Sequence, residues 1–490
     1  MPNPRTPVIV GVGQFLNRIE SLDQAIEPLE MMMCAVHRAE TDAGIGGFLD
    51  QSQSVRVVHG MWSYRNPAAA IAERIGAIGA QTVGTLIGGN QNQALLSATA
   101  LEILAGRFDL VLITGAENGN SAGKARRAGV SLAQTPAPGK PDAVFGAKQQ
   151  PEHHEYERAK GISRAIQVYP MYDNALRYER GETLDEHITR VSSLWARFND
   201  VAQENPNAWE RRNMTAEEIR TPSPKNRQIS FPYTKFMNAN MSVDMAAALV
   251  VCSLEKARRL GIAEDRFVYP QSGVEGYDHF SASVRDNFHT SPGVRITGRR
   301  AMDLAGIDAA DLDFVDLYSC FPSAVQIAAR ELGLSEQRSL TVTGGLTFGG
   351  GPLNNYVMHS IARTVELLRE EPDAYALVTG NGGNLYKHAH GVYSGTPPRR
   401  DFRHDDVKAE IAALPSRQCL PEYDGIAAIE SYTVMYGKEG PSIGHVSCRT
   451  PGGARTWVNT EDAELVEGMV SEEFCGRRVK VRGGQLSVLS

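Results

Sequence analysis

Two side chains with reactive atoms end a short apolar run in the second half of the chain. The run 314–321 (FVDLYSCF) places Tyr318 and Cys320 just before Pro322, where a helix is expected to begin. Side chains at the carboxyl ends of strands in α/β sheets line ligand crevices, and alternation along a strand puts residues 318 and 320 on one face. A thiol near a helix N-terminus can be a nucleophile through a lowered pKa, and a desolvated tyrosine can act as acid or base. An inert buried thiol is the more common alternative for Cys320.

A pair of histidines follows later, in the segment 387–391 (KHAHG). His388 and His390 stand two residues apart, which suggests a metal, but no carboxylate or cysteine stands at ligand spacing beside them. We therefore predict no metal site and keep His388 as a third catalytic candidate. The alternative is a loop histidine that only hydrogen-bonds to the backbone.

Glycine-rich turns accompany these candidates. Residues 341–352 (TVTGGLTFGGGP) indicate a short strand and a glycine turn, and apolar residues at helical spacing predict a helix after it. Residues 374–378 are typical of a buried strand, which a second glycine loop at 379–384 ends. Backbone N–H groups of glycines and of a helix N-terminus suit an anionic or thioester oxygen. Gly351 and Gly382 are therefore predicted to bind substrate.

The same order of elements occurs earlier in the chain. A strand that runs into glycines at 82–89 precedes a helix at 91–104, a buried strand at 109–114 and a loop at 115–123. The segments LVLITGAENGN and YALVTGNGGN are the closest match between the two units. Gly89 is the corresponding candidate for substrate binding. An internal duplication explains the match, and two ordinary βαβ units with glycine caps explain it equally well.

Between the two units the chain changes character. A Pro/Gly/Lys-rich linker at 136–151 is followed by helices at 171–180 and 184–202, which predict a helical insertion over the ligand cleft. Three cations stand between aromatic residues in the segment that follows: Lys225, Arg227 and Lys235. They form either a cationic wall for phosphate groups or an ordinary solvated loop.

Composition limits the class of protein. The chain has 490 residues, of which 42% are hydrophobic and 22% charged, enough for a sizeable core in two or three domains. A net charge of −7 argues against a dedicated nucleic-acid binder, and no stretch reaches the roughly 18 apolar residues of a membrane span. Scattered cysteines without a CxxC pair, and no recognisable signal peptide, predict a cytoplasmic protein with reduced thiols.

The chain after residue 397 differs again, with short apolar runs between Gly/Pro turns. This pattern predicts a small β-barrel or OB-like module. OB folds often bind single-stranded nucleic acid, but acidic residues outnumber basic ones from residue 401 onward. A module for packing or interaction is therefore the better prediction.

In the order of these parts the chain resembles the thiolase superfamily. The N-terminal strand, LITGAEN, DMAAALVV, LYSCF, TGGLTFGGGP and TGNGG fall in thiolase order over about residues 6–395. The loop segment and the β-rich tail are more similar to the thiolase-like protein type 1 group, relatives of sterol-carrier-protein-type thiolases that are commonly called acetyl-CoA acetyltransferases. The resemblance implies an α/β fold with a duplicated αβαβα layered core, a helical loop domain and an additional C-terminal β-rich (OB-like) domain. The implied domains are 1–120 with 231–250 (N-terminal half), 121–230 (loop domain), 251–399 (C-terminal half) and 400–490 (additional domain).

The resemblance also shows which thiolase residues are missing. The position of the nucleophilic cysteine falls on Gly89, and that of the histidine that activates it falls on Gly351. Tyr318 stands where the thiolase oxyanion-hole motif begins, and the late acid/base cysteine is Thr379 or Gly380 here. An acyl-enzyme needs a thiol or alkoxide, which glycine lacks. The glycine amides can still stabilise a thioester enolate.

Three functions are compatible with this resemblance. In the first, the protein cleaves a 3-hydroxyacyl-CoA by retro-aldol chemistry, with Tyr318 as the base and amides near Gly89 and Gly351 around the enolate; some thiolase-fold aldolases are similar in having tyrosine here. In the second, it binds a CoA thioester without catalysis. In the third, Cys320 replaces the missing thiol in acetyl-CoA acyl transfer. The resemblance implies no cofactor beyond the coenzyme A of the substrate, and a homodimer unless the tail covers the pairing surface and leaves a monomer.

Overall fold

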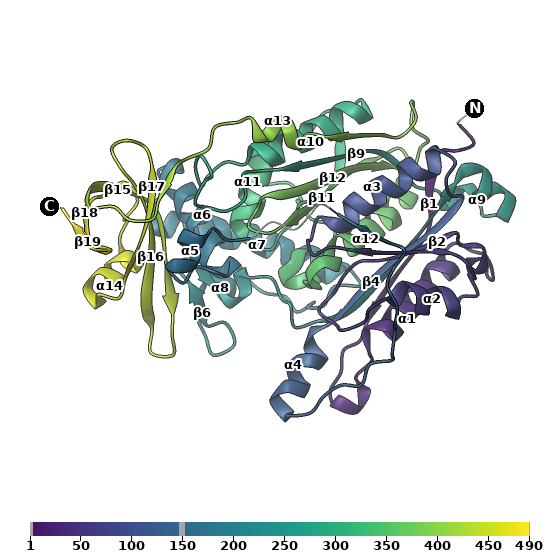
Figure 1. Ribbon diagram of the computed structural model, residues 1–490, viewed down its shortest axis with the longest axis horizontal. Helices are drawn as coiled ribbons and strands as arrows, with labels where there is room; N and C mark the ends of the chain where they lie inside the picture. The colour runs from purple at the N-terminus through teal and green to yellow at the C-terminus, as the bar shows by residue number, and fades with distance from the viewer. Residues whose placement is uncertain (1–2, 147–151, 490) are drawn as a thin grey trace.

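Two β-sheets, with helices between them and on both outer sides, form the core of the protein, as the computed structural model shows (Figure 1). The structure describes residues 3–146 and 152–489. The last part of the predicted linker, residues 147–151, lies outside the described residues. None of the helices in the described ranges is long and apolar enough to cross a membrane.

The first sheet has the strand order β1-β8-β4-β2-β3-β5. β8 runs antiparallel to β1 and β4, whereas β2, β3 and β5 continue parallel to β4. The strands are β1 (Pro7–Leu16), β2 (Ser54–Val57), β3 (Gln81–Thr85), β4 (Leu110–Asn118), β5 (Ala143–Phe145) and β8 (Asp244–Ser253). Helices α1 (Pro28–Asp42) and α2 (Pro67–Arg74) pack on its outer face.

The second sheet repeats this pairing pattern in the order β10-β11-β12-β9-β13. β12 runs antiparallel to its neighbours β9 and β11, as β8 does to β1 and β4 in the first sheet. β10 is parallel to β11, as β2 is to β4. The strands are β9 (Tyr269–Tyr277), β10 (Leu312–Asp316), β11 (Tyr375–Gly382), β12 (Lys387–Ser394) and β13 (Arg403–Asp406). Helix α10 (Pro292–Ala305) packs outside on β9 and β12, and α11 (Pro322–Leu332) packs beside α10. The shared topology supports the duplication hypothesis, and β13 extends the second sheet past residue 400.

Two helices fill the space between the sheets: α3 (Gln91–Leu104) and α12 (Tyr356–Glu370). Each packs against β1 and β8 of the first sheet and β11 of the second. The apolar residues at helical spacing in α12 are fully buried: Val357, Ile361, Val365 and Leu368. Each helix begins just after a glycine turn, so the fold brings both turns into the centre of the molecule.

The second glycine turn differs from its prediction. Residues 341–344 form no strand, and Gly345–Gly349 is a single π-helical turn before a short 3-10 turn at Leu353–Asn355. The cause is Asp316, a fully buried carboxylate that accepts hydrogen bonds from the Thr341 hydroxyl (3.0 Å) and the Val342 N–H (2.9 Å). The backbone N–H of Val342 therefore donates to Asp316 instead of to a neighbouring strand, and no strand forms here.

The predicted loop at 115–123 is also wrong. β4 continues to Asn118, and helix α4 (Gly119–Ala128) begins directly after it. The first turn of α4 is fixed by Asp244 of β8, which accepts hydrogen bonds from the Ser121 N–H (3.0 Å) and hydroxyl (2.6 Å). A carboxylate that accepts hydrogen bonds at a helix N-terminus stabilises the helix, so this segment is helical and not a loop.

The loop domain is helical, as predicted. It contains α5 (Glu155–Ala159), α6 (Ala165–Arg180), α7 (Leu184–Glu204), α8 (Ala216–Arg220) and the short strand β6 (Gln228–Ser230), which pairs with β7 (Tyr233–Thr234) just after the predicted end of the domain. The buried Asp173 of α6 binds His187 of α7 (2.9 Å) and Gln326 of α11 (2.6 Å). These contacts fix the loop domain to the second half of the core.

The C-terminal region is β-rich, as predicted. It contains β14 (Cys419–Leu420), β15 (Gly425–Tyr436), β16 (Pro441–Arg449), β17 (Arg455–Thr460), β18 (Arg478–Arg482), β19 (Gln485–Val488) and helix α14 (Ala463–Ser471). Its strand order is β14-β17-β16-β15-β18-β19, and within the described ranges no pairing joins β14 to β19. Two further helices connect these parts: α9 (Leu254–Leu260) follows β8, and the short α13 (Lys408–Ala412) lies between β13 and β14.

The C-terminal sheet packs on the loop domain and the second half. β15 lies against α6, and Arg455 donates hydrogen bonds to the carbonyl oxygens of Ala282 (2.7 Å) and Arg285 (2.7 Å). Figure 1 shows this sheet at the opposite end of the molecule from the first sheet. This C-terminal sheet therefore does not cover the first half, contrary to one expectation, although Asn3 donates a hydrogen bond to Asp401 at the start of the predicted additional domain (3.1 Å).

Candidate active site

The first glycine turn and the end of β10 meet at one point. A Cβ atom added to Gly89 would overlap both the hydroxyl oxygen of Tyr318 and the carbonyl oxygen of Asn381. Because the Asn381 oxygen belongs to the backbone of β11, no larger residue fits here without a shift of that strand. The Tyr318 hydroxyl thus occupies the space of a side chain at position 89. The structure brings together Gly89 and Tyr318, which are far apart in the sequence.

Tyr318 lies beyond the end of β10, which ends at Asp316. The prediction that strand alternation places Tyr318 and Cys320 on one face of a strand therefore does not apply. Its N–H donates to Thr379 Oγ1 (2.8 Å), and its ring packs edge-on against that of Tyr356. Burial, with a smaller contribution from Cys320, raises the pKa of Tyr318 well above its ordinary value. The phenol is therefore protonated at neutral pH, and only its ionised form can act as the predicted base.

Buried amide groups without partners surround the N-terminus of α3. Asn90 is fully buried, and neither Nδ2 nor Oδ1 has a hydrogen-bond partner among the described residues. The Oδ1 atoms of Asn92 and Asn381 are equally without a described partner. Each such group costs roughly 1–3 kcal/mol, so a cluster of them indicates a site that a ligand or water completes. The sequence prediction missed these asparagines, although they stand directly at the glycine turns, in GGNQN and TGNGG.

Two glycines of β11 allow the close approach of this strand to α3. A Cβ on Gly382 would lie 2.6 Å from Asn90 Oδ1, and one on Gly380 would lie 3.1 Å from Asn90 Cα. A larger residue at position 382 would displace the Asn90 side chain, and one at position 380 would crowd the Asn90 backbone. The structure therefore places Gly382 beside Asn90, and its contact with substrate stays a prediction.

Cys320 lies next to Asn381 and Tyr169. Asn381 Nδ2 donates to the Tyr169 hydroxyl (3.0 Å) and lies 4.0 Å from Cys320 Sγ. Tyr169 comes from α6, stacks on Phe321 and donates to the Gly383 carbonyl oxygen (3.0 Å). Burial raises the pKa of the Cys320 thiol to about 12, although neighbouring hydrogen bonds act in the opposite direction. The predicted lowering of this pKa is wrong, and the thiol is protonated at neutral pH. Sequence reasoning also missed Tyr169, because its approach depends on how α6 packs.

The second glycine turn has no free amide at its predicted position. The Gly351 N–H donates to the Asn240 carbonyl oxygen (2.9 Å), and the Gly350 N–H donates to that of Gly345 (3.2 Å). The Gly345 N–H in turn donates to Thr341 Oγ1 (3.1 Å). The prediction that the Gly351 amide holds an enolate oxygen is therefore wrong, because the fold itself uses this amide.

His388 faces away from the first glycine turn. Its ring is fully buried, Nε2 lies 3.1 Å from Asp278 Oδ2, and the ring contacts Gly293 of α10. On the opposite face of β12, Tyr393 donates to Gln93 of α3 (2.5 Å). His388 therefore points to the outer helix layer, and its position contradicts a catalytic role beside Gly89.

The predicted cations lie on the surface of the loop domain. Arg227 and Lys235 are exposed, as is Lys225, and none of the three forms an ion pair with a described residue. Lys235 begins a short turn that leads to Ala239, whose N–H donates to the Cys320 carbonyl oxygen (3.0 Å). The segment thus borders the site, and phosphate binding by these cations stays a prediction.

Comparison with known proteins gives matches to the C-terminal domain and to the whole chain. A family model described as "Thiolase-like protein type 1 additional C-terminal domain" matches residues 406–485. The crystal structure of a monomeric SCP2-thiolase like protein type 1 from Mycobacterium smegmatis is 30% identical, covers 100% of both chains and has a TM-score of 0.84. The predicted fold class, a thiolase fold with an additional C-terminal β-rich domain, is confirmed.

More distant matches cover the core. A structure described as an Ltp2-ChsH2(DUF35) aldolase is 19% identical over 80% of this chain and 98% of that chain, with a TM-score of 0.59, and shows the fold alone. An acetyl-CoA acetyltransferase of Methanocaldococcus jannaschii is 24% identical over 243 residues, which are 49% of this chain and 54% of that protein. The chain thus spans about half the length, or less, of the curated relatives that it matches.

Proposed function

The chain belongs to the thiolase-like protein type 1 family, and from this we propose that it binds an acyl-CoA thioester and cleaves or forms the C–C bond of a 3-hydroxyacyl-CoA. The observation that carries the proposal is the position of the Tyr318 hydroxyl in the space beside Gly89, where the amide of the following residue, Asn90, has no partner among the described residues. Coenzyme A enters as part of the substrate, and the exposed cations Arg227 and Lys235 are the candidates for its phosphate groups.

The chemistry of the site favours an enolate over an acyl-enzyme. Gly89 has no side chain to attack a thioester, and Cys320 is a protonated thiol at neutral pH because its pKa is about 12. The site offers hydrogen-bond donors instead: Asn90 Nδ2 and the N–H groups of the first turn of α3 that follow Gln91, whose own N–H donates to the Gly88 carbonyl oxygen (3.1 Å). Each donor aimed at a developing oxyanion contributes a few kcal/mol.

In the cleavage direction the ionised fraction of Tyr318, the phenolate, accepts the proton of the 3-hydroxyl and becomes the neutral phenol. The O–H electron pair forms the new carbonyl bond, the Cα–Cβ pair passes to the thioester as an enolate, and a proton then adds at Cα. Formation of the bond is the reverse of these steps. Because burial raises the pKa of Tyr318, only a small fraction is ionised at neutral pH, so we expect turnover to rise with pH between about 6 and 9.

An assay of acyl-CoA release from a 3-hydroxyacyl-CoA, run beside calorimetric titration with acyl-CoA, tests the proposal. We expect the wild type to give both heat and turnover, and Tyr318→Phe to lose about 10²- to 10⁴-fold of the turnover while its affinity changes less than about two-fold. Tyr375→Phe is the matched control, since Tyr375 is a half-buried tyrosine at the start of β11, and it should change neither quantity.

The outcomes separate the alternatives. Heat without turnover in the wild type would leave a CoA-thioester binding protein. Full turnover in Tyr318→Phe would remove Tyr318 from the mechanism. For acyl transfer, mass spectrometry after incubation with acetyl-CoA at pH 7.5 should find no acyl adduct on Cys320, and such an adduct would contradict the enolate route.

We also propose that the protein is a monomer. Thiolases usually pair through their first halves, but here β5 pairs with β3 at the edge of the first sheet. Asp142 fixes this approach by accepting hydrogen bonds from the N–H (2.8 Å) and hydroxyl (2.8 Å) of Thr82. The edge of β3 that β5 occupies is therefore not free to pair with a second copy. The similar protein from Mycobacterium smegmatis is described as monomeric. Light scattering should give 53.3 kDa, and about twice this mass would contradict the proposal.

A further inference from the structure

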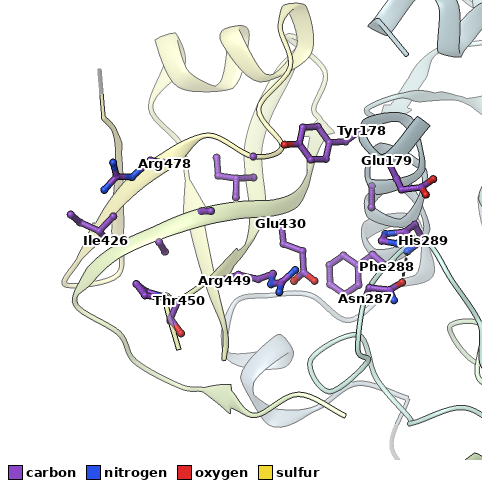
Figure 2. A pocket seen from close by; sticks show the side chains of 16 residues that line it. Tyr178, Glu179, Asn287, Phe288, His289, Ile426, Glu430, Arg449, Thr450 and Arg478 are labelled. Carbon is purple, nitrogen blue, oxygen red and sulfur yellow. Dashed lines mark hydrogen bonds between the residues drawn. The ribbon is translucent and has the colours of Figure 1, made fainter. Parts of the chain in front are cut away.

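A pocket lies between the loop domain and the C-terminal sheet, and it shares no residue with the candidate active site (Figure 2). Its volume is about 620 Å³, inside the range of roughly 300–1,000 Å³ that is typical of small-molecule sites. Ala175 and Tyr178 of α6 line one side, Phe288 and His289 a second, and residues 426–430 of β15 a third. Pockets at such domain boundaries are frequent ligand sites.

Apolar side chains form much of the pocket wall. Ile426 is 44% exposed and Tyr178 is 52% exposed, although both are large and hydrophobic. The Tyr178 ring fits closely against Gly476, where a Cβ would overlap its hydroxyl. Large apolar side chains that remain exposed in one concave place indicate a binding surface.

Two arginines flank this wall from neighbouring strands. Ala428 of β15 pairs with Arg449 of β16 on one side and with Arg478 of β18 on the other, so the three side chains project from one face of the sheet. Figure 2 shows both arginines at the pocket. Both are exposed, and neither forms an ion pair within the described part of the chain. Two strand spacings place the backbones of the two arginines about 10 Å apart. Their long side chains can both reach one anionic group that lies between them.

The acidic residues that line the pocket are already neutralised. Glu430 accepts two hydrogen bonds from Arg455 (2.7 and 2.7 Å), and Glu179 accepts two from Arg330 (2.7 and 2.8 Å). Such bidentate pairs satisfy the carboxylates. The positive charge that remains at the pocket is therefore that of the two flanking arginines.

We propose that this pocket binds one amphipathic organic anion. Its carboxylate or phosphate lies between Arg449 and Arg478, and its apolar chain or ring lies against Ile426, Tyr178 and Phe288. The arginines supply charge-assisted hydrogen bonds, and the apolar wall supplies burial. A ligand placed here contacts α6 and the C-terminal sheet at the same time.

Calorimetric titration of the full chain with octanoate, octyl phosphate and octanol tests this proposal. We expect at least one of the two anions to bind, and octanol to bind about ten-fold more weakly or worse. The double variant Arg449→Gln/Arg478→Gln should lose about ten-fold or more of the anion affinity. The matched control Arg482→Gln, an exposed arginine on the same strand β18 outside the pocket, should stay within about two-fold of the wild type.

A filling variant tests the position of the ligand without a change of charge. Ala428→Phe puts a large side chain between the two arginines, and it should abolish anion binding while the far-UV spectrum and the acyl-CoA titration stay unchanged. No heat with either anion, or equal affinity in the wild type and the double variant, would overturn the proposal. Anion binding that survives Ala428→Phe would place the ligand elsewhere and overturn it as well. A preference between the two anions decides whether the head group is a carboxylate or a phosphate.

Discussion

The two glycine turns come from similar sequence patterns in the two halves of the core, but they differ in their hydrogen bonds. A Cβ on Gly380 would meet Asn90 before α3, and a Cβ on Gly115 would meet Asn355 before α12, so the two places correspond. Asn355 Nδ2 donates to the Gly115 carbonyl oxygen (2.8 Å), and only its Oδ1 lacks a described partner, whereas Asn90 has no described partner for either polar atom. Unused hydrogen-bonding groups, and not glycine content, therefore distinguish the turn that can take a ligand from the turn that stabilises the fold.

The largest expected effect concerns the structural turn. Asp316→Ala should lower the free energy of unfolding by about 3–5 kcal/mol, because it leaves the Tyr356 hydroxyl, the Ser360 hydroxyl and the donors around Thr341 without their buried acceptor. Urea unfolding measures the change. Asp373→Ala, at an exposed position, is the control and should change stability by less than about 0.5 kcal/mol. A loss below about 1 kcal/mol for Asp316→Ala would show that the carboxylate does not hold this turn together.

Glu117 gives a smaller, pH-dependent effect in the first half. It is 4% exposed, the Met61 N–H donates to it (3.0 Å), and burial raises its pKa to about 7. The folded protein therefore keeps a proton that the unfolded chain releases, and the free energy of unfolding should fall by about 3 kcal/mol as pH rises from about 4.5 to 8. Glu117→Gln should remove this part of the pH dependence. Identical pH profiles for both proteins would contradict the assignment.

A pair of asparagine variants gives the smallest effect and the sharpest contrast between the turns. Asn355→Ala should cost about 1 kcal/mol of stability, because it removes a hydrogen bond to Gly115. Asn90→Ala should cost nothing, or stabilise the ligand-free protein by up to about 1 kcal/mol, because it removes buried groups that have no described partner. Thermal unfolding of both variants measures the difference. An equal loss of stability in both would remove the distinction between the two turns.

Local features of the core could be predicted from the sequence. The bounds predicted for the helix at 91–104 are those of α3, because apolar spacing and a preceding glycine turn are both local signals. The features that were missed depend on contacts between distant segments. The direction of His388 follows from which face of β12 packs on α3, and the pKa of Cys320 follows from burial that outweighs the nearby start of α11.

The most direct test of the central claim is a calorimetric titration of Gly89→Ala and Gly351→Ala with acyl-CoA. A methyl group at position 89 would overlap the Tyr318 hydroxyl, whereas one at position 351 would lie 3.2 Å from its nearest neighbours, carbonyl oxygens that need to move only slightly. We predict that Gly89→Ala lowers the affinity about ten-fold or more and that Gly351→Ala, equally folded, stays within about two-fold of the wild type. Loss of affinity in Gly351→Ala with full affinity in Gly89→Ala would contradict the account.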